Sequence, residues 1–224
     1  MSNVPTVTAP EFRDLVKGVP RLALEPGATL ELLVLAADAE QCIGVDMASG
    51  ALVRAWWDNP PDGRLRPYEA VVVTLAHDPE AVPDPSAPEG LALEGDVERV
   101  GHIRGRRAER LLRRLLHPLD EPLLGTHAPA VPLWERRPDR PSTGIIEPHS
   151  QVVLRREPEY LACRFAWQGT VRELPCLDRR VAGEMDHYGE TGRVAERRTR
   201  LVVELTPPID GHCHKVVAAV LPRP

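Results

Sequence analysis

The densest group of reactive side chains is the run His212-Cys213-His214-Lys215 near the end of the chain. Imidazole and thiolate are ligands of zinc, and a thiolate activated by a histidine can act as a nucleophile. In a β-strand, side chains alternate between two faces, so His212 and His214 share one face and Cys213 points to the other. One metal ion could bind all three only if the strand were bulged. The simpler interpretation is that the histidines close a hairpin and satisfy local hydrogen bonds.

Other motifs of catalysis are missing from the sequence. It contains no phosphate-binding glycine loop, no GxSxG nucleophile elbow and no HExxH zinc helix. Glu184, Asp186 and Glu190 lie near one another, but in a polar stretch where carboxylates are usually solvated, so no acid and base pair is indicated. We therefore expect a non-catalytic protein without a metal or cofactor. An enzyme that uses the corner at residues 212–215 is the alternative.

A second set of residues has the types that bind nucleic acids or nucleotides. Arg54 and Trp56 lie two residues apart in a predicted strand, so they point to the same side and offer one cation and one stacking plane. Single-stranded nucleic acids bind to sheets with such combinations, at about 1–3 kcal/mol per stacked base. Arg164 and Lys215 add cations on later predicted strands. Because the chain has four tryptophans, three tyrosines and two phenylalanines, the alternative is that Trp56 fills the core.

A third candidate is an arginine-rich helix predicted between residues 103 and 117. One face is apolar, with residues repeating at helical spacing: Ala108, Leu111, Leu112, Leu115 and Leu116. Pro118 ends the run. The opposite face is basic and consists of Arg104, Arg106, Arg107, Arg110, Arg113 and Arg114. This face, with Arg107 within it, is either a strip that contacts phosphates or a solvated surface neutralised by acids such as Glu109.

Composition restricts how these arginines can be interpreted. The formal charge is −5 at pH 7, which gives no general attraction for phosphate. Of 28 basic side chains, only Lys17 and Lys215 are lysines, a skew typical of a high-GC genome. The number of arginines is therefore no sign of nucleic-acid binding, and only their placement is informative. Four cysteines are widely spaced without a CxxC pair, and we expect them to be reduced and buried.

The remaining pattern is mainly that of β-strands. Residues 30–37 are almost continuously apolar, which is typical of a strand covered on both faces. A hairpin follows, with Asp46 and Gly50 in its turn. Further strands are predicted at residues 70–76, 151–155, 160–167, 171–177, 201–206 and 212–221. Residues 118–150, with seven prolines, and the polar residues 178–198 are predicted to have few elements.

The two ends of the chain resemble the bacterial dual OB-containing domain family, which is associated with conflict and defence systems. The similarity lies in the opening pattern LVLA, QCIGVD and SGALVRAWW, where Cys42, Gly44, Asp46, Gly50 and Arg54 fit the family. In the closing stretch, residues 201–221, Gly211 and Lys215 stand at matching places. The resemblance implies two OB-like barrels over about residues 29–221 and a role in a bacterial defence system.

These observations predict a mainly β protein with one long helix and two small OB-like barrels. The domains are an N-terminal extension (1–28), a first OB-like module (29–102), the helix with a proline-rich connector (103–150) and a second OB-like module (151–224). The beginning of the chain lacks a secretory signal, and no apolar run approaches the ~20 residues of a membrane span. We therefore expect a cytoplasmic protein that does not bind membranes.

The function expected is that of a non-catalytic module that binds nucleic acid or a nucleotide. The residues expected to carry it are Arg54, Trp56, Arg107, Arg164 and Lys215. The alternative is a protein–protein interaction subunit, which would dock a partner through the N-terminal extension or the proline-rich connector. For nucleic acid the contacts would be to phosphates, so binding must weaken as salt rises.

Overall fold

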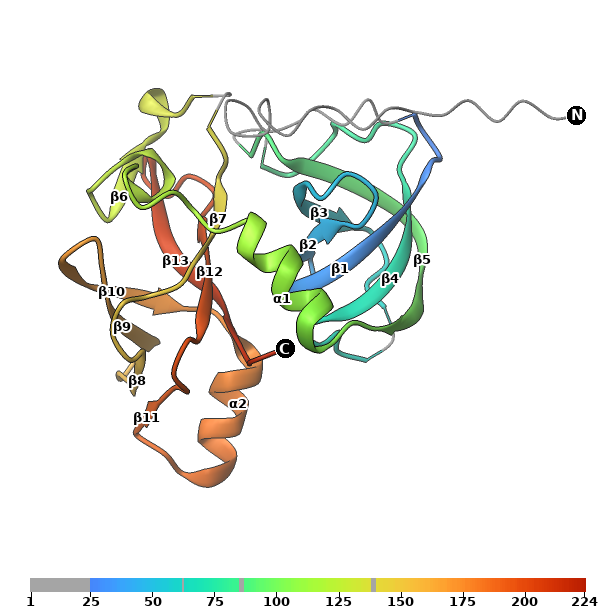
Figure 1. Cartoon of the computed structure of the whole chain (residues 1–224). Helices are drawn as coiled ribbons and strands as arrows, with labels where there is room; N and C mark the ends of the chain where they lie inside the picture. The colour runs from blue at the N-terminus through green and yellow to red at the C-terminus, as the bar shows by residue number, and fades with distance from the viewer. Residues whose placement is uncertain (1–24, 62, 85–86, 138–139) are drawn as a thin grey trace, which may run out of the picture.

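The computed structural model describes residues 25–61, 63–84, 87–137 and 140–224 of the 224-residue chain. It is a mainly β protein with two α-helices, in which a closed barrel lies beside an open sheet (Figure 1). Most of the expected N-terminal extension, residues 1–24, lies outside the described residues. No helix in the described part of the chain is long and apolar enough to cross a membrane.

The first module is a barrel of five strands. These are β1 (Thr29–Ala37), β2 (Gln41–Asp46), β3 (Leu52–Trp57), β4 (Glu69–Leu75) and β5 (Gly90–His102). Their order is β1-β2-β3-β5-β4, and β4 pairs with β1 to close the barrel. The pairing of β3 with β5 is parallel, whereas the other pairs are antiparallel. Closure leaves no free sheet edge in this module.

The turn between β2 and β3 forms as the sequence predicts. The Asp46 carboxylate accepts hydrogen bonds from the backbone N–H groups of Ala48 and Ser49, at 3.4 and 2.9 Å. Gly50 has a φ of 75°, in the left-handed region that glycine adopts without steric cost. Strand β1 is also covered on both faces, as predicted. Its residues Leu32 and Val34 lie in the barrel core, and Leu33 and Leu35 lie in a second cluster outside the barrel.

The second module is an open sheet, so the prediction of a second OB-like barrel is wrong. Its strands are β6 (Ala130–Pro132), β7 (Thr143–Ile146), β8 (Val153–Arg156), β9 (Leu161–Trp167), β10 (Thr170–Cys176), β11 (Gly192–Val194), β12 (Arg200–Leu205) and β13 (His212–Leu221). The order is β11-β8-β9-β10-β13-β12-β7, with β6 paired to β13. The end strands, β11 and β7, have three and four residues. Barrel closure requires the first and last strands to pair with a consistent stagger, and these two do not pair.

The connector and the polar loop contain more structure than predicted. The connector contributes β6, β7 and two short 3-10 turns, at Leu123–Gly125 and Leu133–Glu135. The supposed polar loop at residues 178–198 contains the helix α2 (Arg179–Tyr188), so the expectation of a single long helix is also wrong. Asp178 caps this helix by accepting from the N–H groups of Arg180 and Val181.

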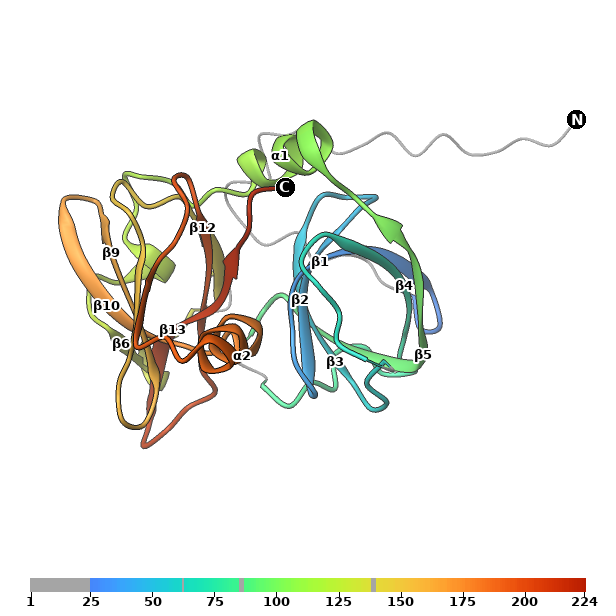
Figure 2. The ribbon, with the colours of Figure 1, turned by 90° about the horizontal axis from the view of Figure 1, so that it is seen from below.

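The other helix, α1 (Gly105–Arg114), lies at the junction of the two modules (Figures 1 and 2). Its buried residues Ala108 and Leu112 belong to a hydrophobic cluster that also contains Leu33 of β1 and Val202 of β12. Because one cluster includes residues from the barrel, the helix and the sheet, the helix packs against both modules at once. The basic face of α1 is thereby held away from this core.

Candidate functional site

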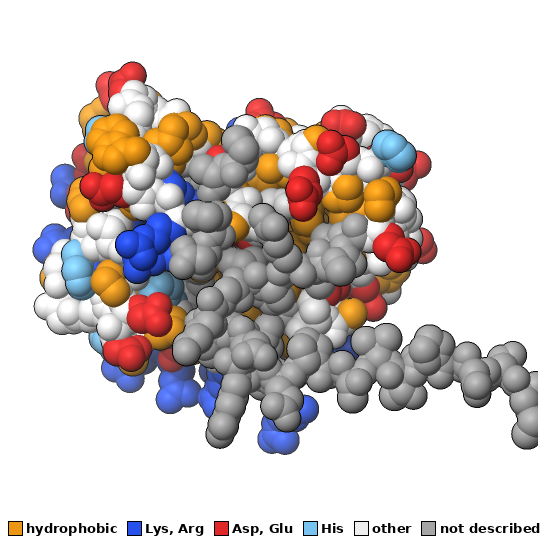
Figure 3. Space-filling model, turned by 90° about the horizontal axis from the view of Figure 1, so that it is seen from above, with side chains coloured by type: hydrophobic (Ala, Val, Ile, Leu, Met, Phe, Trp, Pro, Cys, Tyr) orange, Lys and Arg blue, Asp and Glu red, His pale blue; other side chains and the backbone are white. Residues whose placement is uncertain are grey.

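A groove of about 1240 Å³ lies between α1 and the open sheet. Its lining includes six arginines from three separate parts of the chain: Arg106, Arg113, Arg197, Arg198, Arg200 and Arg223. The two acidic residues in the lining are Glu109 and Glu147. Figure 3 shows basic side chains along its lower edge, which is the side of the molecule where α1 lies. Arginines that are far apart in the sequence therefore lie along one groove, which we call the arginine groove.

Both acidic residues of the groove are engaged by the same buried cation. Arg200 is 5% exposed, and its two terminal nitrogens donate to the carboxylate of Glu109 at 2.7 and 2.8 Å. Its Nε also donates to Glu147 at 3.1 Å. Hydrogen bonding from Arg200 lowers the pKa of Glu109 to about 2, so Glu109 stays ionised at neutral pH. This network fixes the floor of the groove and neutralises its acids.

The remaining arginines of the groove are open to solvent. Arg106, Arg197, Arg198 and Arg223 are exposed, and within the described residues none of their side chains forms an ion pair. Arg113 is also exposed but donates to Glu109 at 2.9 Å. A guanidinium without a carboxylate partner is free to donate two parallel hydrogen bonds to a phosphate. The groove therefore presents several guanidinium groups of the kind that bind phosphate.

The tyrosine and the tryptophan of the groove do not offer stacking surfaces; the exposed ring in its lining is that of His149. Tyr68 and Trp167 are 3% and 1% exposed, and the Tyr68 hydroxyl donates to the backbone oxygen of Pro222 at 2.6 Å. The ring of His117 packs edge-on against Trp167, with 5.5 Å between centroids. Burial lowers the pKa of His117, which disfavours a positive charge on its ring at neutral pH. The groove thus offers charge and hydrogen bonds, and little surface for stacked bases.

Arg54, a predicted ligand contact, is instead buried where the barrel meets the sheet. It is 2% exposed. Its Nε donates to Gln41 of β2 at 2.7 Å and lies 3.3 Å from the carboxylate of Glu204 in β12. One terminal nitrogen donates to the backbone oxygen of Leu205 at 3.1 Å and to Asp84 at 3.4 Å. This guanidinium joins the modules, and no ligand can reach it without separating them.

Trp56 lies beside Arg54, as the spacing predicts, but the two residues contact each other. The guanidinium carbon of Arg54 lies 4.8 Å from the centroid of the Trp56 ring, a cation–π arrangement. Trp56 is half-buried, and its ring also lies 3.0 Å from where a side chain on Gly90 would begin. The pair therefore serves packing at the junction in this structure.

Lys215 is also buried, at 1% exposed. Its ammonium group donates to the backbone oxygen of Thr126, and within the described residues it has no carboxylate partner. Burial, together with a smaller repulsion from Arg172, lowers the pKa of Lys215 to about 8. Lys215 lines neither the arginine groove nor a second cavity, which lies between the barrel and the start of α2.

Arg107 and Arg164 are exposed, as a ligand contact requires, but they are not brought together. Arg107 lies on α1 and Arg164 on β9, and neither lines the arginine groove. The predicted site residues thus divide into two buried cations, one half-buried ring and two separate exposed cations.

The corner at residues 212–215 does not assemble a reactive centre. Cys213 is fully buried in the sheet core, whereas His214 is exposed on the other face, as the alternation predicts. His212 packs edge-on against Trp134, with 5.9 Å between ring centroids. In the part of the chain that the structure describes, no group of three His, Cys, Asp or Glu residues could hold a metal ion.

Sequence reasoning identified the basic face of α1 but missed the other side of the groove. Arg197, Arg198 and Arg223 were not predicted as site residues. The signal available was the local run Arg197-Arg198-Thr199-Arg200, although a run alone does not tell which arginines are buried. Comparisons of this chain with protein-family models, curated proteins and solved structures found no match.

Proposed function

We propose that this protein is a non-catalytic module that binds nucleic acid through the arginine groove. The observation that carries the proposal is the gathering of six arginines in one groove whose two carboxylates are already paired. The four exposed arginines without ion pairs would contact successive phosphates of one strand. Phosphate contacts of this kind supply most of the sequence-independent affinity of nucleic-acid binding proteins.

The groove favours contacts to the backbone over contacts to bases. Its tyrosine and tryptophan are buried, so they cannot supply the stacking that is the usual source of base contacts in single-strand binding sheets. Arginine forks contact any phosphate, whatever base it carries. The proposed binding is therefore tolerant of sequence.

The barrel has the strand number and order of an OB-like module, and we propose that it acts mainly as a scaffold. The sheet module covers it near Arg54, through Glu204 and Leu205. The resemblance to the dual OB-containing domain family adds a bacterial defence system in the cytoplasm as the proposed setting. That part of the proposal rests on the resemblance alone.

A matched pair of variants tests the proposal. The groove variant carries Arg197→Ala, Arg198→Ala and Arg223→Ala. The control variant carries Arg66→Ala, Arg107→Ala and Arg164→Ala, which removes the same charge from exposed side chains outside the groove. Fluorescence anisotropy with a labelled single-stranded oligonucleotide at low salt measures the affinity of both. The groove variant should bind at least about tenfold more weakly than the control, a difference of ~1.4 kcal/mol.

Equal affinities of the two variants would contradict the groove as the binding site. A control variant weaker than the groove variant would favour the sites predicted from sequence, Arg107 and Arg164. No binding by the wild-type protein at low salt would contradict the proposed function itself.

A protein–protein interaction subunit is the second candidate, favoured by exposed apolar side chains on the connector and on the turn between β12 and β13. Trp134 is 74% exposed, and Leu133 and Ile209 are 40% and 56% exposed. Aromatic residues of this kind are frequent at the centres of interfaces. If a partner docks there, Trp134→Ala should abolish its copurification and leave oligonucleotide affinity unchanged.

A further inference from the structure

A second cavity, separate from the arginine groove, lies between the barrel and the start of α2. Its volume is about 340 Å³, within the range of roughly 300–1,000 Å³ that small-molecule sites occupy. It is lined from the barrel by β1, β2, Trp57 of β3 and residues 60, 61, 63–65 and 67, and from the sheet module by β12, β13 and the first turn of α2. It shares no lining residue with the groove. We call it the junction cleft.

The inner part of the junction cleft contains a carboxylate with an unused hydrogen-bonding position. Glu204 lines the cleft and is 3% exposed. Its Oε2 lies 3.3 Å from Nε of Arg54, but that N–H is directed to Gln41, and Oε2 has no hydrogen-bond partner in the described structure. A buried acceptor left without a donor is unfavourable, because it has lost its hydrogen bonds to water. A ligand that donates an N–H here would remove that cost.

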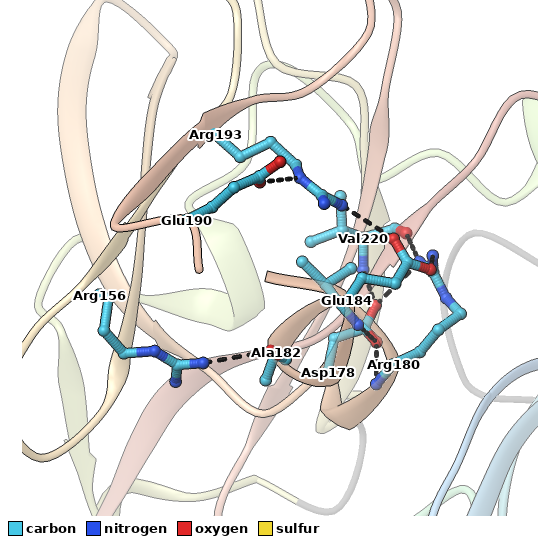
Figure 4. A network of polar contacts seen from close by, with 9 residues as sticks. Arg156, Asp178, Arg180, Ala182, Glu184, Glu190, Arg193 and Val220 are labelled. Atoms are coloured by element: carbon cyan, nitrogen blue, oxygen red, sulfur yellow. Dashed lines mark hydrogen bonds and ion pairs between the residues drawn. The ribbon is translucent and has the colours of Figure 1, made fainter. Parts of the chain in front are cut away.

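Three exposed charged side chains that form no ion pair with one another line the cleft: Arg64, Arg179 and Asp38. Arg64, from the barrel, and Arg179, from the first turn of α2, are both exposed and have no ion pair within the described residues. The neighbouring Arg180 is not free, because it pairs with Asp178 and Glu184, as Figure 4 shows. This network also holds the start of α2 in place. The two arginines outnumber the one exposed acid, Asp38, so the part of the cleft between Arg64 and Arg179 favours an anionic group.

The walls between the rim and Glu204 are apolar and include a large aromatic side chain. They include Leu65, Trp57, Pro60, Pro67, Leu177 and Ala219. The ring of Trp57 is fixed, because its Nε1 donates to the backbone oxygen of Ala39 at 3.1 Å. A ligand of matching chemistry has an anionic end, a flat apolar middle and an N–H donor at the far end. A free phosphate could contact the arginines of the rim, but it could not contact the apolar walls or donate a hydrogen bond to Glu204.

We propose that the junction cleft binds a nucleoside monophosphate. The phosphate lies between Arg64 and Arg179, the base lies against the apolar walls, and an amino or imino group of the base donates to Oε2 of Glu204. This site is distinct from the groove and binds a single nucleotide, whereas the groove binds a strand. It does not depend on the proposed strand binding.

Isothermal titration of the full chain tests the proposal. Adenosine, guanosine, cytidine and uridine 5′-monophosphates are compared with their nucleosides, with ribose 5-phosphate and with inorganic phosphate. At least one monophosphate should bind at least about tenfold more tightly than its nucleoside and than ribose 5-phosphate. The double variant Arg64→Ala/Arg179→Ala should reduce its affinity to that of the nucleoside, because both substituted side chains are exposed and the fold is retained.

Two further variants make the assignment specific. Glu204→Gln should weaken the nucleoside and the monophosphate alike, since it changes the contact to the base. The groove variant Arg197→Ala/Arg198→Ala/Arg223→Ala should leave monophosphate binding unchanged. The proposal is overturned if no monophosphate binds at about 1 mM, if ribose 5-phosphate or inorganic phosphate binds as tightly, or if the groove variant rather than the Arg64/Arg179 variant abolishes binding.

Discussion

The barrel and the region that follows it have opposite charge. Residues 29–102 contain 14 acidic and 4 basic side chains, a formal charge of −10, whereas residues 103–224 contain 16 acidic and 21 basic side chains, a charge of +5. The overall charge of −5 hides this asymmetry. Every charged residue that lines the arginine groove comes from the second region. The electrostatic attraction for phosphate is therefore concentrated away from the barrel.

The two regions also differ in whether their sheets are closed. The barrel pairs all of its strands, whereas the second sheet ends in the short strands β11 and β7 and relies on α1 and α2 for cover. A closed barrel is suited to act as a rigid scaffold for the second region. The open sheet beside α1 leaves space for the arginine groove. The predictions below test whether the two regions have these separate roles.

The largest effect is expected for Arg54→Ala, which removes the cation that joins the two regions. The substitution leaves Glu204 without its buried counter-charge, and breaking a buried pair on one side costs roughly 3–5 kcal/mol. Urea denaturation should show this loss, whereas Arg164→Ala, at an exposed site, should change the free energy of unfolding by less than about 0.5 kcal/mol. A loss equal to that of the exposed control would mean that Arg54 does not couple the modules.

The next prediction concerns the pH dependence of the same junction. The pKa of Glu204 is raised to about 7, mainly by burial. The charge of Arg54 and a hydrogen bond from Gln41 oppose the rise, whereas repulsion from Asp38 and Glu89 adds to it. Because the folded pKa lies above the ordinary 4.5, this contribution to stability is fully present below pH 4.5 and is lost as pH rises through about 7. Glu204→Gln cannot titrate, so its unfolding free energy should fall less over this range, by on the order of 1–3 kcal/mol.

Urea melts at several pH values between about 4.5 and 7.5 measure this difference, with Glu98→Gln as an exposed carboxylate control. Parallel pH profiles for Glu204→Gln and the wild-type protein would show that Glu204 does not titrate abnormally.

The smallest effect is expected for Lys215→Met, which removes a cation from the basic region without touching the groove. Replacing a buried charge that lacks a carboxylate partner by an apolar side chain should leave stability unchanged or raise it by up to about 1 kcal/mol near pH 7. Affinity for an oligonucleotide should not change. A clear loss of affinity would indicate that total charge, rather than placement in the groove, governs binding.

Local patterns in the sequence predicted much of the fold. Asp46 and Gly50 define the first hairpin, and the spacing of Ala108 and Leu112 defines α1, because these signals act between near neighbours. Strand β5 was missed because only Leu91 and Leu93 near its start are buried, in alternation with the half-buried Gly90 and Ala92, and most of its remaining residues are exposed. Helix α2 was missed because its polar residues concealed the Asp178 cap and the left-handed Gly189 at its end.

The candidate sites could be predicted only in part. The groove combines Arg106 of α1 with Arg198 and Arg223, which lie about 90 or more positions later in the chain, so only tertiary packing brings them together. The sequence also did not indicate which cations are buried. Arg54 and Lys215 occur in strand patterns that do not distinguish an exposed cation from a buried one.

The most direct test of the account is the salt dependence of oligonucleotide binding by the wild-type protein and the groove variant. The logarithm of the affinity is measured against the logarithm of the salt concentration. If Arg197, Arg198 and Arg223 each contact one phosphate of a single strand, the slope should become shallower by about 2 in the groove variant. Identical slopes for the two proteins would contradict the assignment of phosphate binding to the groove.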